Sequence, residues 1–330
     1  MVYYNKFRRN NVPVHFSISL TNKCNLKCIH CLRLKESKNE ISTAQVKDFL
    51  TQLSREGCLC VTLTGAEPFM RKDFFEIAGF ARKLGFALRI LSNGTSIDKR
   101  TVQRLKKLSC ELRITLYGIT ARTHDSITGV KGSFDKTIKG FELLEKAKIS
   151  FDIAVVVLRN NFFEIESLQR ELKKRKWEFR NDFVIYPSLD GSLDPLGLRI
   201  TNEQLASAIK KRLIDARDGT TTHNDKKKAL SDAARLNGYI SSKGKVYPSF
   251  FLKTEIGDLK KNSLHDIWHN SPVVRKLREL PLTKVPCARC AHRRTCNRDL
   301  GLIENKAGRI TVATEWCRIM NARKEIKKHG

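Results

Sequence analysis

Strand-like and helix-like segments alternate from Val14 to about Arg217, and this alternation limits the fold more than any other feature of the sequence. We expect strands at residues 15–20, 58–65, 86–94, 111–118, 151–158 and 182–187. The segments between them carry apolar residues at three- and four-residue intervals, which is typical of helices that pack on a sheet. The pattern predicts an α/β chain of six βα units in a partial, splayed barrel. A doubly wound open sheet fits the same pattern.

The first predicted helix has well-marked ends. Ser42 and Gln45 form a capping-box pattern, and Gly57 stands where a helix would stop. Its apolar face consists of Val46, Phe49, Leu50 and Leu53. We therefore expect a helix between the first two strands.

The chain divides by composition into three parts. We expect a core at residues 1–217, a polar linker at 218–230, and a second region at 231–330 in which four cysteines are concentrated. Because the first predicted strand begins close to the start of the sequence, we expect no separate peptide-recognition domain before it.

The charge of the chain favours an anionic partner. The 330 residues include 63 Lys and Arg against 34 Asp and Glu, a net charge of +29. The basic residues are spread along the chain without interleaved aromatic residues, which argues against direct nucleic-acid recognition. No apolar run is long enough to cross a membrane, and the basic N-terminus lacks an apolar signal core. We expect a cytoplasmic protein.

Three cysteines follow the first predicted strand in the spacing CxxxCxxC: Cys24, Cys28 and Cys31. Three thiolates from one loop can hold a 4Fe–4S cluster and leave one iron open to a further ligand. The alternatives are a zinc site or buried apolar cysteines, but zinc usually takes a closed set of four ligands.

This loop resembles that of the radical S-adenosylmethionine (SAM) family, which carries it after the first strand of a (β/α)6 barrel. After the second strand, Thr64 to Pro68 is similar to the GGEP segment that receives the methionine amino group in that family. The resemblance assigns cofactor contacts to Gly65, Ala66 and Glu67, with Ala66 in place of the usual second glycine.

Further cofactor contacts follow from the same resemblance. Ser92 and Asn93, at the end of the third strand, resemble the segment that contacts the ribose, although a plain Asn-Gly turn has the same sequence. Thr115 occupies the position of a polar cofactor contact. Lys136 is a candidate partner of the cofactor carboxylate, or a solvated lysine on a helix surface.

The resemblance implies a radical SAM enzyme. A donor such as flavodoxin or ferredoxin would reduce the cluster, S-adenosyl-L-methionine would be cleaved to a 5′-deoxyadenosyl radical, and this radical would abstract a hydrogen atom from the substrate.

The cysteines of the second region resemble those of the SPASM extension of radical SAM enzymes. They are Cys287, Cys290, Cys296 and Cys317. Alone, this set would also suit a structural zinc ribbon. SPASM proteins usually hold two auxiliary clusters, but Ser249, Leu300 and Ser231 or a neighbour of it replace the cysteines of the first one. The resemblance therefore implies one catalytic and one auxiliary 4Fe–4S cluster, the second in a small C-terminal cysteine-rich domain.

Three cysteines remain outside these sets. Cys58 and Cys60 alternate on the second predicted strand, and Cys110 precedes the fourth. Buried cysteine usually acts as a small apolar residue. Cys60 and Cys110 are retained as candidate hydrogen-atom donors, the only catalytic residues that the sequence suggests.

The expected substrate also follows from the resemblance. SPASM enzymes most often modify ribosomally made peptides, so we expect a peptide or protein maturase. The net charge of +29 keeps open a nucleic acid, a nucleotide-derived compound or another small anionic metabolite. An iron–sulfur electron carrier is the alternative outside enzymes.

Overall fold

The structure is a computed structural model, and it describes residues 2–32, 39–188, 192–214, 234–250, 252, 254–279, 290, 302–304, 310–312 and 314–329. The linker expected at 218–230 lies outside the described residues.

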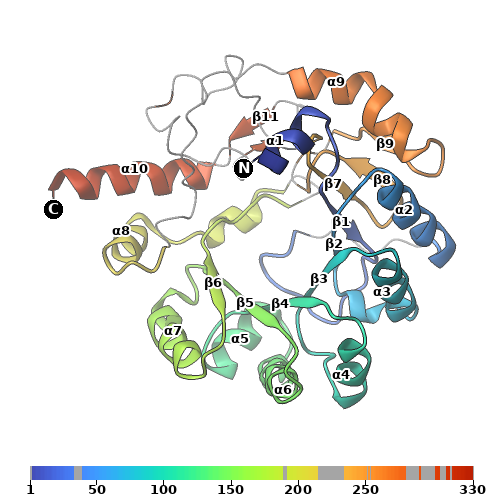
Figure 1. Cartoon of the computed structure of the whole chain (residues 1–330). Coiled ribbons are helices and arrows are strands. Elements are labelled where there is room, and N and C mark those ends of the chain that lie inside the picture. Colours follow the sequence, from blue (N-terminus) through green and yellow to red (C-terminus); the bar gives the residue numbers. More distant parts are fainter. Residues whose placement is uncertain are drawn as a thin grey trace.

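Six parallel strands form the central sheet, and each pairs with the next strand along the chain. They are β1 (His15–Ser19), β2 (Cys60–Thr64), β3 (Ala87–Ser92), β4 (Glu111–Leu116), β5 (Phe151–Val156) and β6 (Phe179–Asp182). The strands form an arc with helices on its outer side (Figure 1). This confirms the predicted α/β fold with a partial (β/α)6 barrel.

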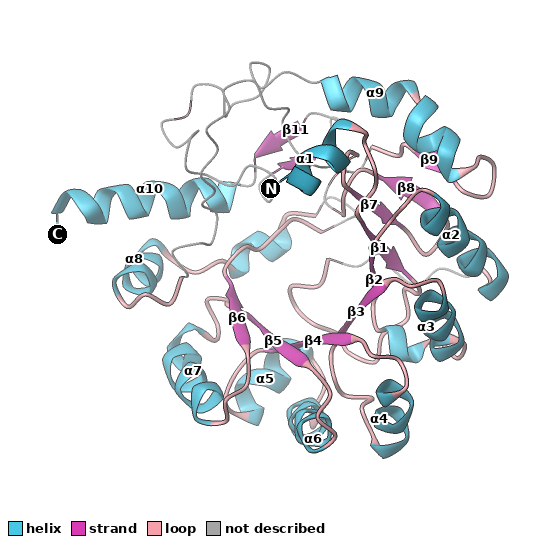
Figure 2. Ribbon diagram, viewed as in Figure 1, coloured by secondary structure: helices cyan, strands magenta, loops and turns pink. Residues whose placement is uncertain are grey.

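Helices connect consecutive strands and cover the outside of the arc (Figure 2). They are α2 (Thr43–Arg55), α3 (Phe74–Lys83), α4 (Lys99–Lys106), α5 (Ala121–Thr128), α6 (Ser133–Lys146), α7 (Ile165–Lys174) and α8 (Asn202–Lys210). A short helix, α1 (Val2–Arg9), precedes the sheet. The capping box of Ser42 and Gln45 is present at the start of α2, as the sequence predicts. No described helix has the length and hydropathy needed to cross a membrane.

The sixth strand differs from the prediction. We expected it at residues 182–187, but β6 ends at Asp182, and the strand instead uses residues 179–182 to pair with β5. The Asp182 carboxylate accepts the N–H of Val184, which turns the chain out of the sheet. Phe183, Val184 and Ile185 are buried all the same, so their apolar character reports burial and not a strand.

The two faces of the sheet differ in polarity because side chains alternate along each strand. Ile18, Leu63 and Ile114 point to the helices and have 0% exposure. The inner face is polar: Arg113 pairs with Asp152 on the neighbouring strand, 2.5 Å between Nη2 and Oδ2. The apolar core therefore lies between sheet and helices, and the inside of the arc keeps polar groups.

The C-terminal region extends the same sheet. Strand β7 (Asn237–Ile240) pairs in parallel with β1, and β8 (Lys245–Tyr247) and β9 (Gly257–Asp258) follow in antiparallel order. Beyond them lie α9 (Pro272–Glu279), the hairpin of β10 (Leu302–Glu304) and β11 (Ile310–Val312), and α10 (Thr314–His329). The first strand is thus shared by the barrel and the C-terminal region.

Trp268 attaches the C-terminal region to the barrel. It lies in a π-helical turn, Asp266–Asn270, and its side chain is fully buried. The ring packs on Phe16 of β1 with centroids 5.2 Å apart, and the indole N–H donates to the carbonyl oxygen of Asn11 at 2.6 Å. A substitution here therefore tests the contact between the two regions.

Trp268→Ala should lower the free energy of unfolding by about 3–5 kcal/mol, because it leaves a cavity against Phe16 and an unpaired carbonyl. Phe163→Ala is the control, since Phe163 is 73% exposed. Denaturant unfolding of the two variants beside the wild type measures the difference. Equal midpoints for the two variants would contradict the assignment of Trp268 to the core.

Candidate active site

Three loops meet at the carboxyl ends of β1, β2 and β3. They are the cysteine loop with Cys24, Cys28 and Cys31, the Gly-Ala-Glu-Pro turn at residues 65–68, and the Ser-Asn-Gly turn at residues 92–94. The carboxyl ends of parallel strands lie on one edge of the sheet, where α/β proteins bind ligands. The structure therefore places on one edge of the sheet the first three cysteines and five of the residues that the sequence assigns to the cofactor: Gly65, Ala66, Glu67, Ser92 and Asn93.

The turn after β2 is held against the segment after β1 by its backbone. The N–H of Ala66 donates to the carbonyl of Thr21 at 2.8 Å, and the N–H of Glu67 donates to that of Lys23 at 3.0 Å. Gly65 has φ of +144°, and a Cβ there would lie 2.5 Å from the Thr21 carbonyl oxygen. Only glycine allows this close approach.

The carboxylate of Glu67 joins this turn to the next one. It is fully buried and accepts the hydroxyl of Ser92 at 3.0 Å, the N–H of Asn93 at 2.8 Å and the N–H of Phe69 at 3.2 Å. Burial raises the pKa of Glu67 to about 7, and the bonds from Asn93, Phe69 and Ser92 limit the rise. Glu67 thus acts inside the protein as a tie between two turns.

Asn93 also reaches the cysteine loop. Its side-chain amide donates to Oδ1 of Asn25 at 2.9 Å and lies 3.9 Å from Sγ of Cys24, while Asn25 donates to the hydroxyl of Thr95 at 2.7 Å. Sequence reasoning missed Asn25 and Thr95, because nothing in the local pattern links residues about 70 positions apart. The network fixes the loop relative to the end of β3.

The cysteine loop also docks on the end of α5. The N–H groups of Lys27 and Ile29 donate to the carbonyls of Thr128 and Ile127 at 2.8 and 3.0 Å. The helix ends at Gly129 in the left-handed conformation, φ +68°, and a Cβ there would lie 2.9 Å from the Lys27 carbonyl oxygen. The loop is therefore held on two sides.

The surroundings of the thiols fit a metal cluster. Burial raises the pKa of Cys28 to about 12; the hydrogen bond from Tyr117 limits this rise, and the charges of Cys31 and Cys24 add to it. Such a thiol keeps its proton in water unless a metal ion replaces it. The backbone N–H of Leu26 also donates to Sγ of Cys24 at 3.4 Å, as expected for a thiolate ligand. The donor set suits an iron–sulfur cluster.

Tyr117 and His30 flank Cys28, and neither was singled out from the sequence. Nε2 of His30 lies 2.9 Å from the Tyr117 hydroxyl, which lies 3.9 Å from Sγ of Cys28. Burial lowers the pKa of His30 to about 4, so the ring is neutral near pH 7. The two rings meet edge to face beside the loop, with centroids 5.2 Å apart.

Thr115 and Lys136 are the remaining residues that the sequence assigns to the cofactor. Thr115 is half-buried on the inner face of β4, two residues before Tyr117, which follows the end of the strand. Lys136 lies on the exposed side of α6. Its neighbour Thr137 is fully buried and donates to the carbonyl of Asn93 at 3.1 Å. Helix α6 therefore reaches the Ser-Asn-Gly turn through Thr137, a residue that the sequence analysis did not single out.

Cys60 and Cys110 lie away from the cysteine loop. Cys60 begins β2 and Cys110 directly precedes β4, so both stand at the amino ends of strands. A strand of five residues spans about 16 Å. The structure does not bring either thiol together with the loop at the carboxyl ends, and Cys58 is likewise buried near the amino end of β2.

Of the four C-terminal cysteines, the structure describes two. Cys290 and Cys317 are close enough for Cys290 to add to the effect of burial in raising the pKa of Cys317. Cys287 and Cys296 lie outside the described residues. Ser249, which stands where the resemblance expects a cysteine, accepts the N–H of Leu252 through its hydroxyl at 3.3 Å.

Comparison with known proteins gives the family. A profile of the radical SAM superfamily matches residues 18–172, and a profile of the SPASM iron-sulfur cluster-binding domain matches residues 233–291. The matched segments include the three site loops and two of the C-terminal cysteines.

Relatives and solved structures agree with these profiles. The chain is 27% identical to an AdoMet-dependent heme synthase of Methanosarcina barkeri, over 87% of this chain and 90% of that protein. It is 28% identical to the mycofactocin maturase MftC of Mycobacterium tuberculosis, over 87% and 78%. The structure of anSMEcpe with bound AdoMet and Kp18Cys peptide matches with a TM-score of 0.67 and 17% identity, over 95% and 96%.

The open barrel and the matched profiles define an enzyme of the radical type that works with an iron–sulfur cluster and S-adenosyl-L-methionine. The chain belongs to the radical SAM superfamily, and its C-terminal region carries a SPASM domain.

Glu67→Gln should weaken SAM binding about tenfold or more, because an amide would set its own N–H against the N–H of Asn93 or Phe69 and loosen both turns. The control is Glu76→Gln on α3, where the carboxylate is 58% exposed and pairs with Lys47. Equilibrium binding of SAM to the cluster-loaded proteins measures the effect. Unchanged affinity in Glu67→Gln would remove Glu67 from the positioning of the cofactor.

Proposed function

We propose that this radical SAM enzyme modifies a ribosomally made peptide or a protein side chain. The observation that carries the proposal is the 28% identity to the maturase MftC across 87% of this chain. The anSMEcpe structure, which has the same fold, was solved with a peptide and AdoMet together. The net charge of +29 would favour an acidic segment in the substrate.

Two clusters are part of the proposal. The first would be held by Cys24, Cys28 and Cys31, and the second by Cys287, Cys290, Cys296 and Cys317. When bound and reduced by a donor such as flavodoxin or ferredoxin, the first cluster and SAM supply a 5′-deoxyadenosyl radical. A cluster with four thiolates has no open iron, so electron transfer or structural support is its expected role.

The protein itself contributes position and shielding. We assign the methionine amino group to the turn of Gly65, Ala66 and Glu67, with Glu67 acting through the backbone that it holds. Ser92 and Asn93 are assigned to the ribose. A primary radical reacts with little selectivity in solution, so the chain must hold one C–H bond of the substrate beside it and exclude water.

Two further residues are assigned by position. Thr115 lies on the inner face of β4, two residues before Tyr117, and is proposed as a polar contact of the cofactor. Lys136 is exposed on α6 beside Thr137, which contacts the Ser-Asn-Gly turn, and is proposed as a partner of the cofactor carboxylate. The division into a core at 1–217, a linker at 218–230 and a cluster domain at 231–330 belongs to the same proposal.

The purified protein should contain about eight irons per chain, four in each cubane. Cys317→Ala should remove about four of them and still form 5′-deoxyadenosine from SAM, whereas Cys28→Ala should abolish this product. Anaerobic iron analysis and chromatography of the products measure both. About twelve irons in the wild type would contradict the count, and an absence of 5′-deoxyadenosine from the wild type would favour an electron carrier.

A second candidate substrate follows from a separate observation. The chain covers 90% of the length of the AdoMet-dependent heme synthase and 78% of that of MftC. A heme precursor with carboxylate groups is also a small anionic metabolite, which suits the net positive charge. This candidate needs no peptide-binding surface.

Deuterium transfer distinguishes the two substrates. We expect a perdeuterated peptide encoded next to the gene to pass deuterium into 5′-deoxyadenosine during anaerobic turnover with SAM, because the radical takes its hydrogen directly from the substrate. Mass spectrometry of 5′-deoxyadenosine and of the peptide gives the readout.

The matched control is the Cys28→Ala variant with the same peptide, which should transfer none. Deuterium that arrives from a labelled heme precursor and not from the peptide would replace the peptide proposal by the second candidate.

A further inference from the structure

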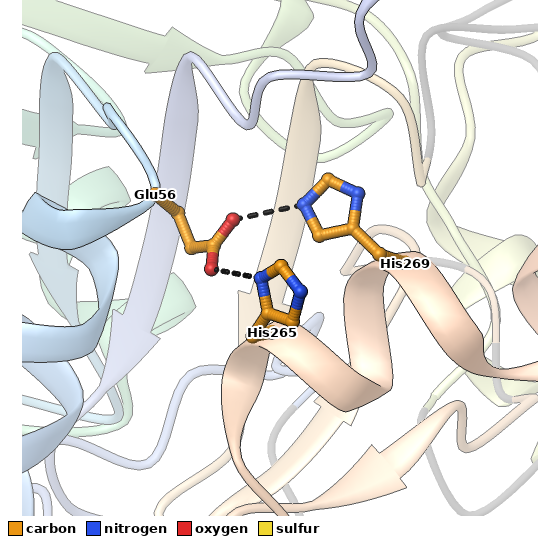
Figure 3. Close-up of side chains that lie close together, drawn as sticks. All are labelled: Glu56, His265 and His269. Carbon is orange, nitrogen blue, oxygen red and sulfur yellow. Dashed lines mark hydrogen bonds and ion pairs between the residues drawn. The ribbon is translucent and has the colours of Figure 1, made fainter.

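Two histidines and a glutamate meet at a second place in the molecule, on the outer side of the barrel. Glu56 directly follows α2. His269 lies on the π-helical turn Asp266–Asn270, and His265 directly precedes this turn. Nδ1 of His265 lies 2.9 Å from one carboxylate oxygen, and Nε2 of His269 lies 2.8 Å from the other (Figure 3). All three ligand atoms lie within 4.8 Å of one another.

The fold holds these side chains in place before any ligand binds. Glu56 caps α2 through its backbone N–H, which donates to the carbonyl of Gln52 at 3.0 Å. The side chain of Gln52 accepts the N–H of Leu264 at 2.6 Å, so the end of α2 also positions the start of the turn. The two histidines are four residues apart and project from one face of the turn toward Glu56 (Figure 3).

Burial makes the group more than a surface ion pair. The Glu56 side chain is 14% exposed and that of His269 is 29% exposed, whereas His265 is 65% exposed. The carboxylate is thus largely withdrawn from water, and one side of the group stays open to it. Such an arrangement shields the ligands and leaves room for water as a further ligand.

We propose that Glu56, His265 and His269 form a mononuclear site for a divalent transition metal ion of the zinc type. Two imidazoles and one carboxylate are a usual set of three protein ligands for zinc, with water in the fourth position. The facing nitrogens would bind through their lone pairs, with each ring proton on the other nitrogen.

Zinc binding would require the three side chains to adjust their positions. Zinc bonds of about 2.0–2.1 Å in a tetrahedral site separate the ligand atoms by about 3.3 Å. The present N···O separations of 2.8 and 2.9 Å would therefore widen by about half an ångström. The two imidazole nitrogens, which lie within 4.8 Å of each other, would settle at about 3.3 Å. His265 is mostly exposed and can move by this amount without disturbing the core.

The site is separate from the radical chemistry. Glu56 stands before β2, at the amino end of the strand, whereas the cysteine loop and the Glu67 turn lie at the carboxyl ends. In the chain, Glu56 is 209 residues from His265 and 213 residues from His269. A metal ion here would clamp the turn that carries Trp268 to helix α2 and so stabilise the attachment of the C-terminal region. This inference does not depend on which substrate the enzyme uses.

Zinc binding to the cluster-loaded protein tests the site. The wild type should take up one zinc ion per chain beyond its iron, measured by anaerobic calorimetry and by metal analysis after desalting. Zinc at about a hundred times its Kd should raise the Tm by roughly 3–5 °C. His269→Ala and Glu56→Gln should lose this zinc, with affinity at least tenfold lower.

His265→Ala is the decisive variant, because its ring is the most exposed of the three and its removal should not disturb folding. Glu76→Gln is the matched control: it removes a carboxylate that α3 presents to Lys47 of α2. Iron content confirms that each variant has folded. Absence of zinc from the wild type, or equal zinc in the wild type and His265→Ala, would overturn the proposal.

Discussion

The buried carboxylate of Glu67 is the interaction on which the candidate site depends. It receives bonds from Ser92 and Asn93, which join the ends of β2 and β3. The backbone N–H of Glu67 in turn holds the segment after β1. Withdrawing a carboxylate from water is unfavourable, and the pKa of Glu67 rises to about 7 for this reason. The hydrogen bonds offset much of that cost, and in return three strand ends keep a common geometry.

The first strand connects this site to the C-terminal region. Its carboxyl end leads into the cysteine loop. One of its edges pairs with β2 and the other with β7. Phe16 on the same strand packs against Trp268, which directly precedes His269. The SPASM region is therefore attached through backbone pairing and a buried aromatic contact, and a change in this region would act on the strand that carries the cluster loop.

The local sequence was sufficient for much of the fold. The capping box at Ser42, the glycine at Gly65 and the alternation along β1 to β5 depend on neighbours a few residues away, and such short-range patterns appear directly in the sequence. The sixth strand was placed too late because residues 183–185 are apolar and buried without pairing. Apolar character predicts burial, and it does not distinguish a strand from a buried connection.

The sequence by itself determined the family, the six βα units and the positions of the cysteine loop and the two turns after β2 and β3. Only the tertiary structure decided which side chains meet: Glu67 with Ser92, Asn93 with Asn25, and Glu56 with His269. These partners are 25, 68 and 213 residues apart. Periodicity and turn signals report the surroundings of one segment. Contacts between distant segments depend on the packing of whole strands and helices, because that packing sets which loop ends share one edge of the sheet.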